Sequence, residues 1–324
     1  MSEIKLQLPE SFCQRLEKIV PDDQLSFVLD SFHQVKQTTF RINTLAADRD
    51  AILARLGKLE IPLTPIPWVT DRLQQPLAFS TDSSHRQQLT HSPVIDAGEI
   101  YLQNLSSMLA AVVMDAQPDE QILDLAAAPG GKTIHLAQQM ENTGTLAAVE
   151  VVRGRMFKLQ ANLRRCRVSN CRTYLTDGRT VGAKTPERFD RVLLDAPCSS
   201  EARFRAGDPK TWEQWSPRKL RETARKQIGL LKSAIRATKP GGTILYCTCS
   251  FAPEENEAVL TKILKKFDGL IDILPVDVPL ENVMAGIESF DGIAYHPQVL
   301  HALRILPNEI MDGFFLAKLQ VKKM

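Results

Sequence analysis

Two cysteines that follow strand-like runs offer the most distinctive chemistry in this sequence of 324 residues. Cys198 stands in Asp-Ala-Pro-Cys-Ser at residues 195–199, and Cys249 stands in Thr-Cys-Ser at residues 248–250. Both motifs follow short apolar runs that are typical of buried strands. Because open α/β folds bind ligands at the carboxyl edge of the sheet, we expect both thiols to lie at that edge.

A turn rich in small residues precedes both cysteines. Residues 122–133 read Ile-Leu-Asp-Leu-Ala-Ala-Ala-Pro-Gly-Gly-Lys-Thr, which predicts a buried strand, a turn and a helix that begins near Gly131. Small residues let a ligand approach the backbone, and free amides at a helix start favour an anionic group. Ala126 stands where a P-loop needs its first glycine. The turn alone indicates a nucleotide-like ligand without separating nicotinamide, flavin and S-adenosylmethionine.

Acidic residues end the strand-like runs that follow this turn. Glu150 lies about 20 residues past it, where a carboxylate can accept hydrogen bonds from both hydroxyls of a ribose. Asp177 and Asp195 end two further runs. The spacing therefore narrows the prediction to a nucleoside ligand that lies across several strand ends.

Together these motifs resemble the RsmB/Nol/Nop/Sun family of RNA cytosine-5 methyltransferases. The small-residue turn, the Asp-Ala-Pro-Cys-Ser strand end and the Thr-Cys-Ser strand end occur in the family's order. Shorter matches lie at residues 40–44, 103–108, 254–257 and 313–317. The chain departs from the family in having Ala126 where Cys is frequent and Ser200 where Gly is frequent. The resemblance covers about residues 40–320, and the second departure bears on substrate choice more than on chemistry.

The resemblance implies an S-adenosylmethionine-dependent enzyme that makes 5-methylcytosine in RNA. Cytosine C5 becomes nucleophilic only after a group adds at C6, which requires an activated thiolate. By resemblance, Cys249 is the attacking nucleophile and Cys198 assists release of the methylated product. Asp195 would hydrogen-bond the base and support the charge that develops there, and Lys132 would steady an anionic group near the turn.

Two overlapping sets of site residues are therefore expected. The catalytic set is Cys249, Cys198, Asp195 and Lys132. The set that binds S-adenosylmethionine is Ala126, Ala127, Ala128, Pro129, Gly130, Gly131, Lys132, Glu150, Arg155, Asp177 and Asp195. A helix is predicted from Pro253, which would place Cys249 before a helix N-terminus that lowers its pKa, although Glu254 and Glu255 oppose that effect.

Three alternatives stay open on the sequence alone. A DNA cytosine-5 enzyme would attack with Cys198 and leave Cys249 idle, so separate substitution of the two cysteines distinguishes it. An amino-group methyltransferase would need an Asn/Asp-Pro-Pro-aromatic strand end, which residues 195–198 do not provide. A noncatalytic RNA-binding assembly factor on a methyltransferase fold would be indicated by a failure to bind the cofactor.

Charge is segregated along the chain although the formal net charge is only +2. Residues 151–239 hold 22 Lys and Arg against 8 Asp and Glu, whereas the rest of the chain holds 18 and 30. Such segregation suits a polyanion beside the active site, and Arg203 and Arg205 are expected near the target nucleotide. The expected partner is ribosomal or transfer RNA whose target cytosine is unpaired or flipped from its stack.

The order of predicted elements indicates an α/β protein with two units. Residues 1–95 carry helical patterns, one extended run and a proline-broken stretch, which predict a small α+β domain for RNA binding or substrate positioning. Strands and helices alternate over residues 96–324, which predicts a Rossmann-like class I methyltransferase domain. Its sheet is expected to be mainly parallel, with helices on both faces and a closing antiparallel hairpin at residues 300–306 and 313–320.

Composition points to a soluble protein of a reducing compartment. With 44% hydrophobic and 24% charged residues, the chain can form one large core and a smaller unit. Two of its six cysteines are needed as thiols, which fits the cytoplasm. Residues 1–6 lack the apolar stretch of a secretion signal, and residues 101–114 are too short and polar to span a membrane. We therefore expect a cytoplasmic monomer without a membrane or metal partner.

Overall fold

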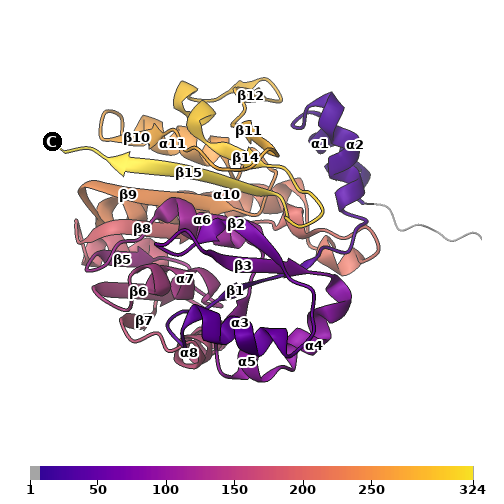
Figure 1. Ribbon diagram of the computed structural model, residues 1–324. Helices are drawn as coiled ribbons and strands as arrows, with labels where there is room; N and C mark the ends of the chain where they lie inside the picture. Colours follow the sequence, from indigo (N-terminus) through magenta and orange to yellow (C-terminus); the bar gives the residue numbers. More distant parts are fainter. Residues whose placement is uncertain (1–7, 324) are drawn as a thin grey trace, which may run out of the picture.

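The computed structural model of the protein describes residues 8–323, so the expectation for residues 1–6 lies outside its described part. Its central feature is a nine-stranded sheet in the order β11-β14-β15-β9-β8-β5-β6-β7, with β10 paired to β15 (Figure 1). The strands are β5 (Gln121–Asp124), β6 (Thr145–Glu150), β7 (Cys171–Leu175), β8 (Phe189–Asp195), β9 (Thr238–Thr248), β10 (Ile271–Leu274), β11 (Val283–Ala285), β14 (Leu303–Ile305) and β15 (Phe314–Val321).

The core of this sheet is parallel, as predicted. Strands β7, β6, β5, β8 and β9 pair in parallel, and β15 then joins β9 in the antiparallel direction. The predicted closing hairpin is confirmed, because β14 and β15 pair antiparallel with Leu303 opposite Leu316. The middle residues of the central strands are apolar because both faces are covered: in β5, Ile122 joins one core cluster and Leu123 another.

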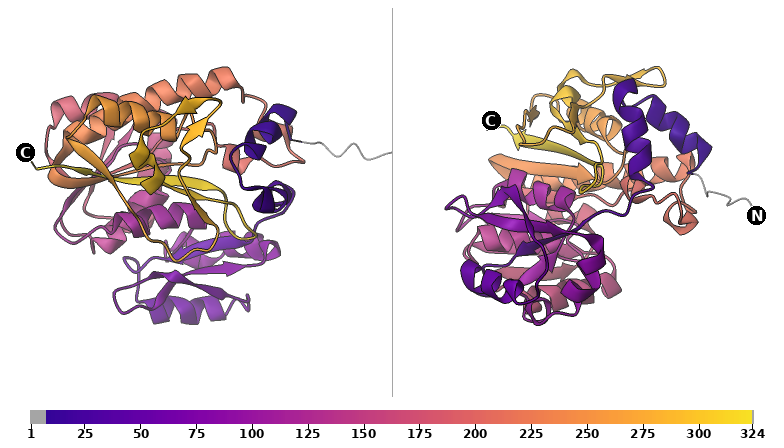
Figure 2. Two further views of the ribbon diagram at one scale, coloured as in Figure 1. Left: turned by 90° about the horizontal axis from the view of Figure 1, so that it is seen from above. Right: turned by 45° about the vertical axis from the view of Figure 1, so that its right-hand side comes forward.

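Helices cover both faces of the sheet, which confirms the predicted layers (Figure 2). One face carries α6 (Leu105–Met114), α7 (Gly131–Gln139) and α8 (Arg153–Arg165). The other carries α9 (Val181–Lys184), α10 (Pro217–Ala237) and α11 (Glu257–Lys266). The loops at the carboxyl ends of the parallel strands also carry the short 3-10 helices η2 (Gly178–Thr180), η3 (Glu201–Arg203) and η4 (Pro209–Thr211).

A second, four-stranded antiparallel sheet packs over the α6 face, in the order β2-β3-β1-β4. Its elements are β1 (Thr38–Ile42), α3 (Arg49–Gly57), β2 (Thr64–Thr70), β3 (Pro76–Thr81), η1 (Ser83–His85), α4 (Arg86–Thr90), α5 (Pro93–Asp96) and β4 (Ile100–Leu102). The stretch read as broken by prolines therefore forms strands. Pro65 and Pro67 lie in β2 at the edge of the sheet, where a missing N–H group is tolerated. Strand β4 lies beyond the predicted boundary after residue 95. Because it pairs with β1, the small sheet contains strands from both predicted domains.

The two N-terminal helices pack elsewhere. Helices α1 (Glu10–Glu17) and α2 (Asp22–Ser31) lie against the loops that follow β8 and β9, apart from the small sheet (Figure 1). The ring of Phe12 lies 4.9 Å from that of Phe204 and 6.4 Å from that of Phe251. The remaining elements are β12 (Ser289–Phe290), β13 (Ile293–Ala294) and η5 (Pro297–His301). Residues 8–95 thus contribute to two separate apolar clusters, one under the small sheet and one around α1 and α2.

Within residues 8–323, no helix has the length and apolar character needed to cross a membrane. The same residues contain no group of three or more His, Cys, Asp or Glu side chains placed to hold a metal ion.

Candidate active site

The two motif cysteines meet at the carboxyl edge of the sheet, as predicted. Strands β8 and β9 are parallel neighbours, and Asp195 pairs with Cys247 near their ends. Cys198 lies three residues beyond β8 and Cys249 one residue beyond β9. Their Sγ atoms are 3.2 Å apart, within hydrogen-bonding distance for sulfur. One base can therefore reach both thiols at once.

The environment separates the acidities of the two thiols. The pKa of Cys249 is lowered to about 7, first by the hydrogen bond from Cys198 and then by the positive charge of Arg203, against the opposing effect of burial. The same hydrogen bond, together with burial, raises the pKa of Cys198 well above its usual value. Cys249 is thus the thiol that ionises near neutral pH, while Cys198 keeps its proton, and a thiolate is the nucleophilic form of cysteine.

The predicted helix is present as α11, but its predicted start at Pro253 is wrong, because α11 begins only at Glu257. Asn256 folds the intervening segment into a tight loop: its side chain accepts a hydrogen bond from Thr248 Oγ1 at 2.7 Å and donates one to the Ser250 carbonyl at 2.8 Å. The low pKa of Cys249 therefore arises from its neighbours rather than from a helix N-terminus.

We expect methyl transfer to rise with pH through about 7 as the Cys249 thiolate forms. The groups that set this midpoint are the Cys198 thiol and the charges of Arg203 and Asp195. Arg203→Gln should move the midpoint to higher pH, because the thiolate loses a favourable charge. The measurement is the rate of Cys249 alkylation against pH, with kcat/KM followed in parallel. A wild-type midpoint near the ordinary thiol value of 9.0, or a downward shift in the variant, would contradict this electrostatic picture.

Lys132 and Asp195 form an ion pair beside the thiols. Lys132 lies in the first turn of α7, which Gly130 enters with φ of 109°, and its Nζ donates to Asp195 Oδ2 at 2.7 Å and to Ser107 Oγ at 2.8 Å. Burial is the largest single influence and lowers the pKa of Lys132, but the charges of Asp195 and Cys247 and the hydrogen bond to Asp195 together leave it raised. The Asp195 side chain remains 33% exposed, so it is held firmly and is still accessible to a base. Ser107 was missed as a site residue, although it lies within the family match at residues 103–108.

A cavity of about 200 Å³ lies beside the small-residue turn. Four of the predicted cofactor residues line it: Ala126, Glu150, Arg155 and Asp177. The other predicted residues, Ala127, Ala128, Pro129, Gly130, Gly131, Lys132 and Asp195, are not part of its wall. The wall also contains residues that the sequence did not single out, namely Leu125, Val151, Thr176, Gly178, Arg179, Pro197, Lys226 and Leu230.

Hydrogen bonds fix the acidic residues of this cavity. Glu150 Oε1 accepts the Val152 N–H at 2.8 Å, and its Oε2 lies 3.5 Å from Arg155 Nη1. Arg155 also donates to the Ala128 carbonyl at 2.6 Å and so ties this strand end to the turn. The hydrogen bond from Arg179 lowers the pKa of Asp177 and keeps it ionised. Fixed carboxylates of this kind suit the hydroxyl donors of a ribose, so the residues present fit a nucleoside cofactor.

Glu150→Ala should weaken the binding of S-adenosylmethionine by about 1–3 kcal/mol, because hydrogen bonds to a charged acceptor are lost. Isothermal titration calorimetry of the two proteins checks this. Glu222→Ala, which removes an exposed carboxylate paired with Arg218, is the control and should bind as the wild type does. Equal affinities for the wild type and Glu150→Ala would place the ribose elsewhere.

The basic segment at residues 151–239 contributes to both faces of the sheet. Adjacent residues of β6 face opposite sides of the sheet, with Ala148 in the cluster of α8 and Val149 in that of α10. Its cations are therefore divided between two faces. Arg205, expected near the target nucleotide, pairs with Asp312 at 3.1 Å. A polar pocket of about 320 Å³ lies beside Cys198, and the basic segment provides its wall. The lining residues are Cys198, Ser199, Lys210, Thr211, Gln214, Trp215, Lys219 and Thr223.

Comparisons with known sequences agree with this geometry. A protein-family model described as 16S rRNA methyltransferase RsmB/F matches residues 111–320. The chain is 33% identical over 321 residues to ribosomal RNA small subunit methyltransferase F of Cronobacter sakazakii, covering 97% of this chain and 63% of that protein. It is also 33% identical over 324 residues to the protein of the same name from Escherichia coli, covering 99% and 64%. The chain thus spans just under two thirds of the length of these relatives.

Solved structures give the same fold. A methyltransferase homologue from Pyrococcus horikoshii superimposes with a TM-score of 0.81 at 28% identity, covering 99% of this chain and 100% of that chain. NSun6 from the same organism, solved with SFG, has a TM-score of 0.79 at 21% identity, with the same coverage, and supports the fold alone. The Rossmann-like methyltransferase fold predicted from the motifs is confirmed, and so is the resemblance. The chain belongs to the RsmB/F family of 16S rRNA methyltransferases.

Proposed function

We propose that the protein transfers the methyl group of S-adenosylmethionine to C5 of a cytosine in small-subunit ribosomal RNA. The observation that carries this proposal is the pair of thiols 3.2 Å apart, one with its pKa lowered to about 7 and the other with its pKa raised. Family membership supports the reaction class. The names of the curated relatives favour small-subunit ribosomal RNA over transfer RNA.

The residues divide the reaction into addition, transfer and elimination. The Cys249 thiolate adds to C6 of the cytosine, which forms a carbon–sulfur bond and makes C5 nucleophilic. Asp195, held by Lys132, hydrogen-bonds the base and supports the charge that develops on it. S-adenosylmethionine, when bound, supplies an electrophilic methyl group to C5. A general base then removes the C5 proton, which restores the aromatic ring, breaks the C6–sulfur bond and expels the Cys249 thiolate, a release that Cys198 assists.

We place the cofactor in the cavity at the end of β6. Its wall provides the Glu150 carboxylate for the ribose hydroxyls, Arg155 to hold the turn, and Asp177 on the adjacent strand end. The small residues of the turn leave the backbone open to close approach. We propose a monomer as the working form. We propose the cytoplasm as its compartment, because the reaction requires two free thiols.

The thiol pair argues against two of the alternative functions, a DNA cytosine-5 methyltransferase and a noncatalytic assembly factor. A DNA cytosine-5 enzyme would attack with Cys198, and yet that thiol has its pKa raised well above the usual value. A noncatalytic assembly factor would have no use for a cysteine whose pKa is lowered to about 7 beside a second thiol. We propose that the N-terminal elements position the RNA, because α1 and α2 contact the loops that carry both thiols.

Transfer of radiolabel from S-adenosylmethionine tests the function. Purified small-subunit ribosomal RNA, transfer RNA and DNA would be incubated separately with the protein, each taken from cells that lack the gene. We expect label in the ribosomal RNA, with bisulfite sequencing locating a 5-methylcytosine that is absent without the gene. Label in transfer RNA alone would overturn the proposed substrate, and label in DNA alone, or in none of the three, would overturn the proposed activity.

A further inference from the structure

Few backbone hydrogen bonds connect the loop that carries Cys198 with the loop that carries Cys249. Beyond the last paired residues of β8 and β9, the Ala196 N–H donates to the Cys247 carbonyl at 2.9 Å, and the Ala202 N–H donates to the Cys249 carbonyl at 3.1 Å. Neither bond directly holds the Cys198 backbone. From α10, Gln227 Nε2 donates to the Pro197 carbonyl, just before Cys198, at 2.9 Å. Further hydrogen bonds come from side chains that cross from one thiol loop to the other.

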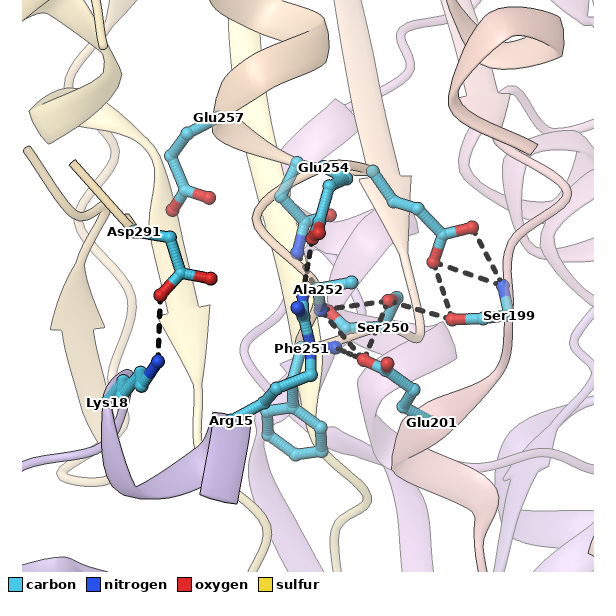
Figure 3. Close-up of polar contacts among 12 residues, drawn as sticks. Arg15, Lys18, Ser199, Glu201, Ser250, Phe251, Ala252, Glu254, Glu257 and Asp291 are labelled. Carbon is cyan, nitrogen blue, oxygen red and sulfur yellow. Dashed lines mark hydrogen bonds and ion pairs between the residues drawn. The ribbon is translucent and has the colours of Figure 1, made fainter. Parts of the chain in front are cut away.

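Glu201 crosses from the Cys198 loop to the Cys249 loop. Its side chain is buried, and its Oε2 accepts the Phe251 N–H at 2.8 Å, the Ala252 N–H at 2.7 Å and the Ser250 hydroxyl at 3.0 Å. Its Oε1 accepts the indole N–H of Trp215 at 2.7 Å. Figure 3 shows the carboxylate directed at the backbone just after Cys249. One side chain thus fixes three consecutive residues of the opposite loop.

Glu255 crosses in the other direction, from the Cys249 loop to the Cys198 loop. It is fully buried, and its carboxylate accepts the Ser199 N–H at 3.0 Å and the Ser199 hydroxyl at 2.5 Å. The hydroxyls of Ser199 and Ser250 then lie 3.0 Å apart and connect the two carboxylates (Figure 3). The residue after each cysteine is therefore held by a carboxylate from the other loop.

The negative charges of Glu201 and Glu255 do not help to ionise the thiols. Neither forms an ion pair with any residue in the described part of the chain, and burial raises the pKa of Glu201 and raises that of Glu255 to about 7. The charge of Glu255 also raises the pKa of Cys198. Buried carboxylates are costly unless hydrogen bonds satisfy them, and such networks serve to specify a geometry.

Helix α1 covers this network from outside. Phe12 packs on Phe204 and Phe251, one from each loop, and Arg15 pairs with Glu254 at 2.5 Å (Figure 3). The apolar cover keeps water from competing for the hydrogen bonds of Glu201, since hydrogen bonds are stronger in a region of low dielectric constant.

We propose that Glu201 and Glu255 are positioning residues, a reciprocal pair of latches that hold the Cys198 and Cys249 loops in register and so maintain the Cys198–Cys249 hydrogen bond. They act through the thiols and touch no substrate. The inference deepens the proposed function and rests on it for its catalytic consequence, but the thiol geometry itself can be tested without RNA.

The pH dependence of Cys249 alkylation by iodoacetamide, read by mass spectrometry of its peptide, tests this in Glu201→Gln and Glu255→Gln. Removal of a nearby negative charge alone would move the alkylation midpoint to lower pH. Loss of the latch removes the hydrogen bond from Cys198 and moves the midpoint to higher pH, by about one unit. We expect the upward shift, a kcat lower by about 10- to 100-fold, and an unchanged affinity for S-adenosylmethionine.

Glu254→Gln is the matched control, because its carboxylate lies on the same loop but faces Arg15. It should keep the wild-type midpoint. Ser199→Ala is the second variant should a glutamine variant fail to fold, since it removes only one hydroxyl contact of Glu255 and should shift the midpoint upward by less. An unchanged or lowered midpoint in the folded variants would overturn the latch. If the wild-type protein methylates no RNA but the glutamine variants still shift the alkylation midpoint upward, the proposed function is overturned and the positioning role of Glu201 and Glu255 is retained.

Discussion

Cys249→Ala should abolish methyl transfer and leave the binding of S-adenosylmethionine intact. The substitution removes the group that adds to C6, so the barrier to methylation returns toward that of the unactivated base. By analogy with the loss of other enzyme nucleophiles, we expect kcat to fall by at least about 10⁴-fold. Cofactor affinity should stay unchanged, because Cys249 is not part of the cavity wall at the end of β6.

Single-turnover methylation of the RNA target and calorimetry with the cofactor measure these two effects separately. Cys247→Ala is the matched control: this neighbouring cysteine is fully buried, and its pKa is raised well above the usual value. The control should retain turnover, with any loss confined to stability. Sustained methylation by Cys249→Ala would eliminate Cys249 as the nucleophile.

Cys198→Ala should trap the protein on its RNA. If Cys198 assists release, its removal leaves a covalent adduct between Cys249 and the methylated cytosine that breaks down slowly. The adduct should also form more slowly, because the lost hydrogen bond from Cys198 raises the pKa of Cys249. A band of protein and RNA that survives denaturing electrophoresis should therefore build up over time to a level much higher than in the wild type.

The double variant Cys198→Ala/Cys249→Ala should give no such band, because it lacks the attacking thiol. An adduct that persists in this variant would show that another group attacks the base. Rapid turnover by Cys198→Ala without any adduct would mean that release needs no second thiol.

The sequence predicted the parts of the site that are local in the chain. The small-residue turn and the start of α7 at Gly131 follow from short-range patterns, and so do the strand ends at Asp195 and Glu150. The edge shared by the two cysteines followed from the rule that parallel strands present their carboxyl ends together. These predictions rest on periodicity and turn chemistry, which act within a few residues.

What the sequence did not predict depends on contacts between distant segments. Ser107 reaches Lys132 only because α6 packs beside α7, and Glu201 reaches Ser250 across 49 positions of the chain. The start predicted for α11 at Pro253 was wrong for the same reason, since Asn256 accepts a hydrogen bond from Thr248 at the end of β9. Tertiary hydrogen bonds there override the local preference for a helix.

The most direct test of a Cys249 adduct is to identify the thiol that holds the base. The protein would be incubated with S-adenosylmethionine and a target RNA that carries 5-fluorocytidine, whose fluorine cannot leave as the C5 proton does. Elimination is then blocked after methyl transfer, and mass spectrometry of the digested complex locates the nucleotide. The account predicts the modified base on Cys249. A base attached to Cys198, or no adduct from protein that methylates ordinary RNA, would contradict it.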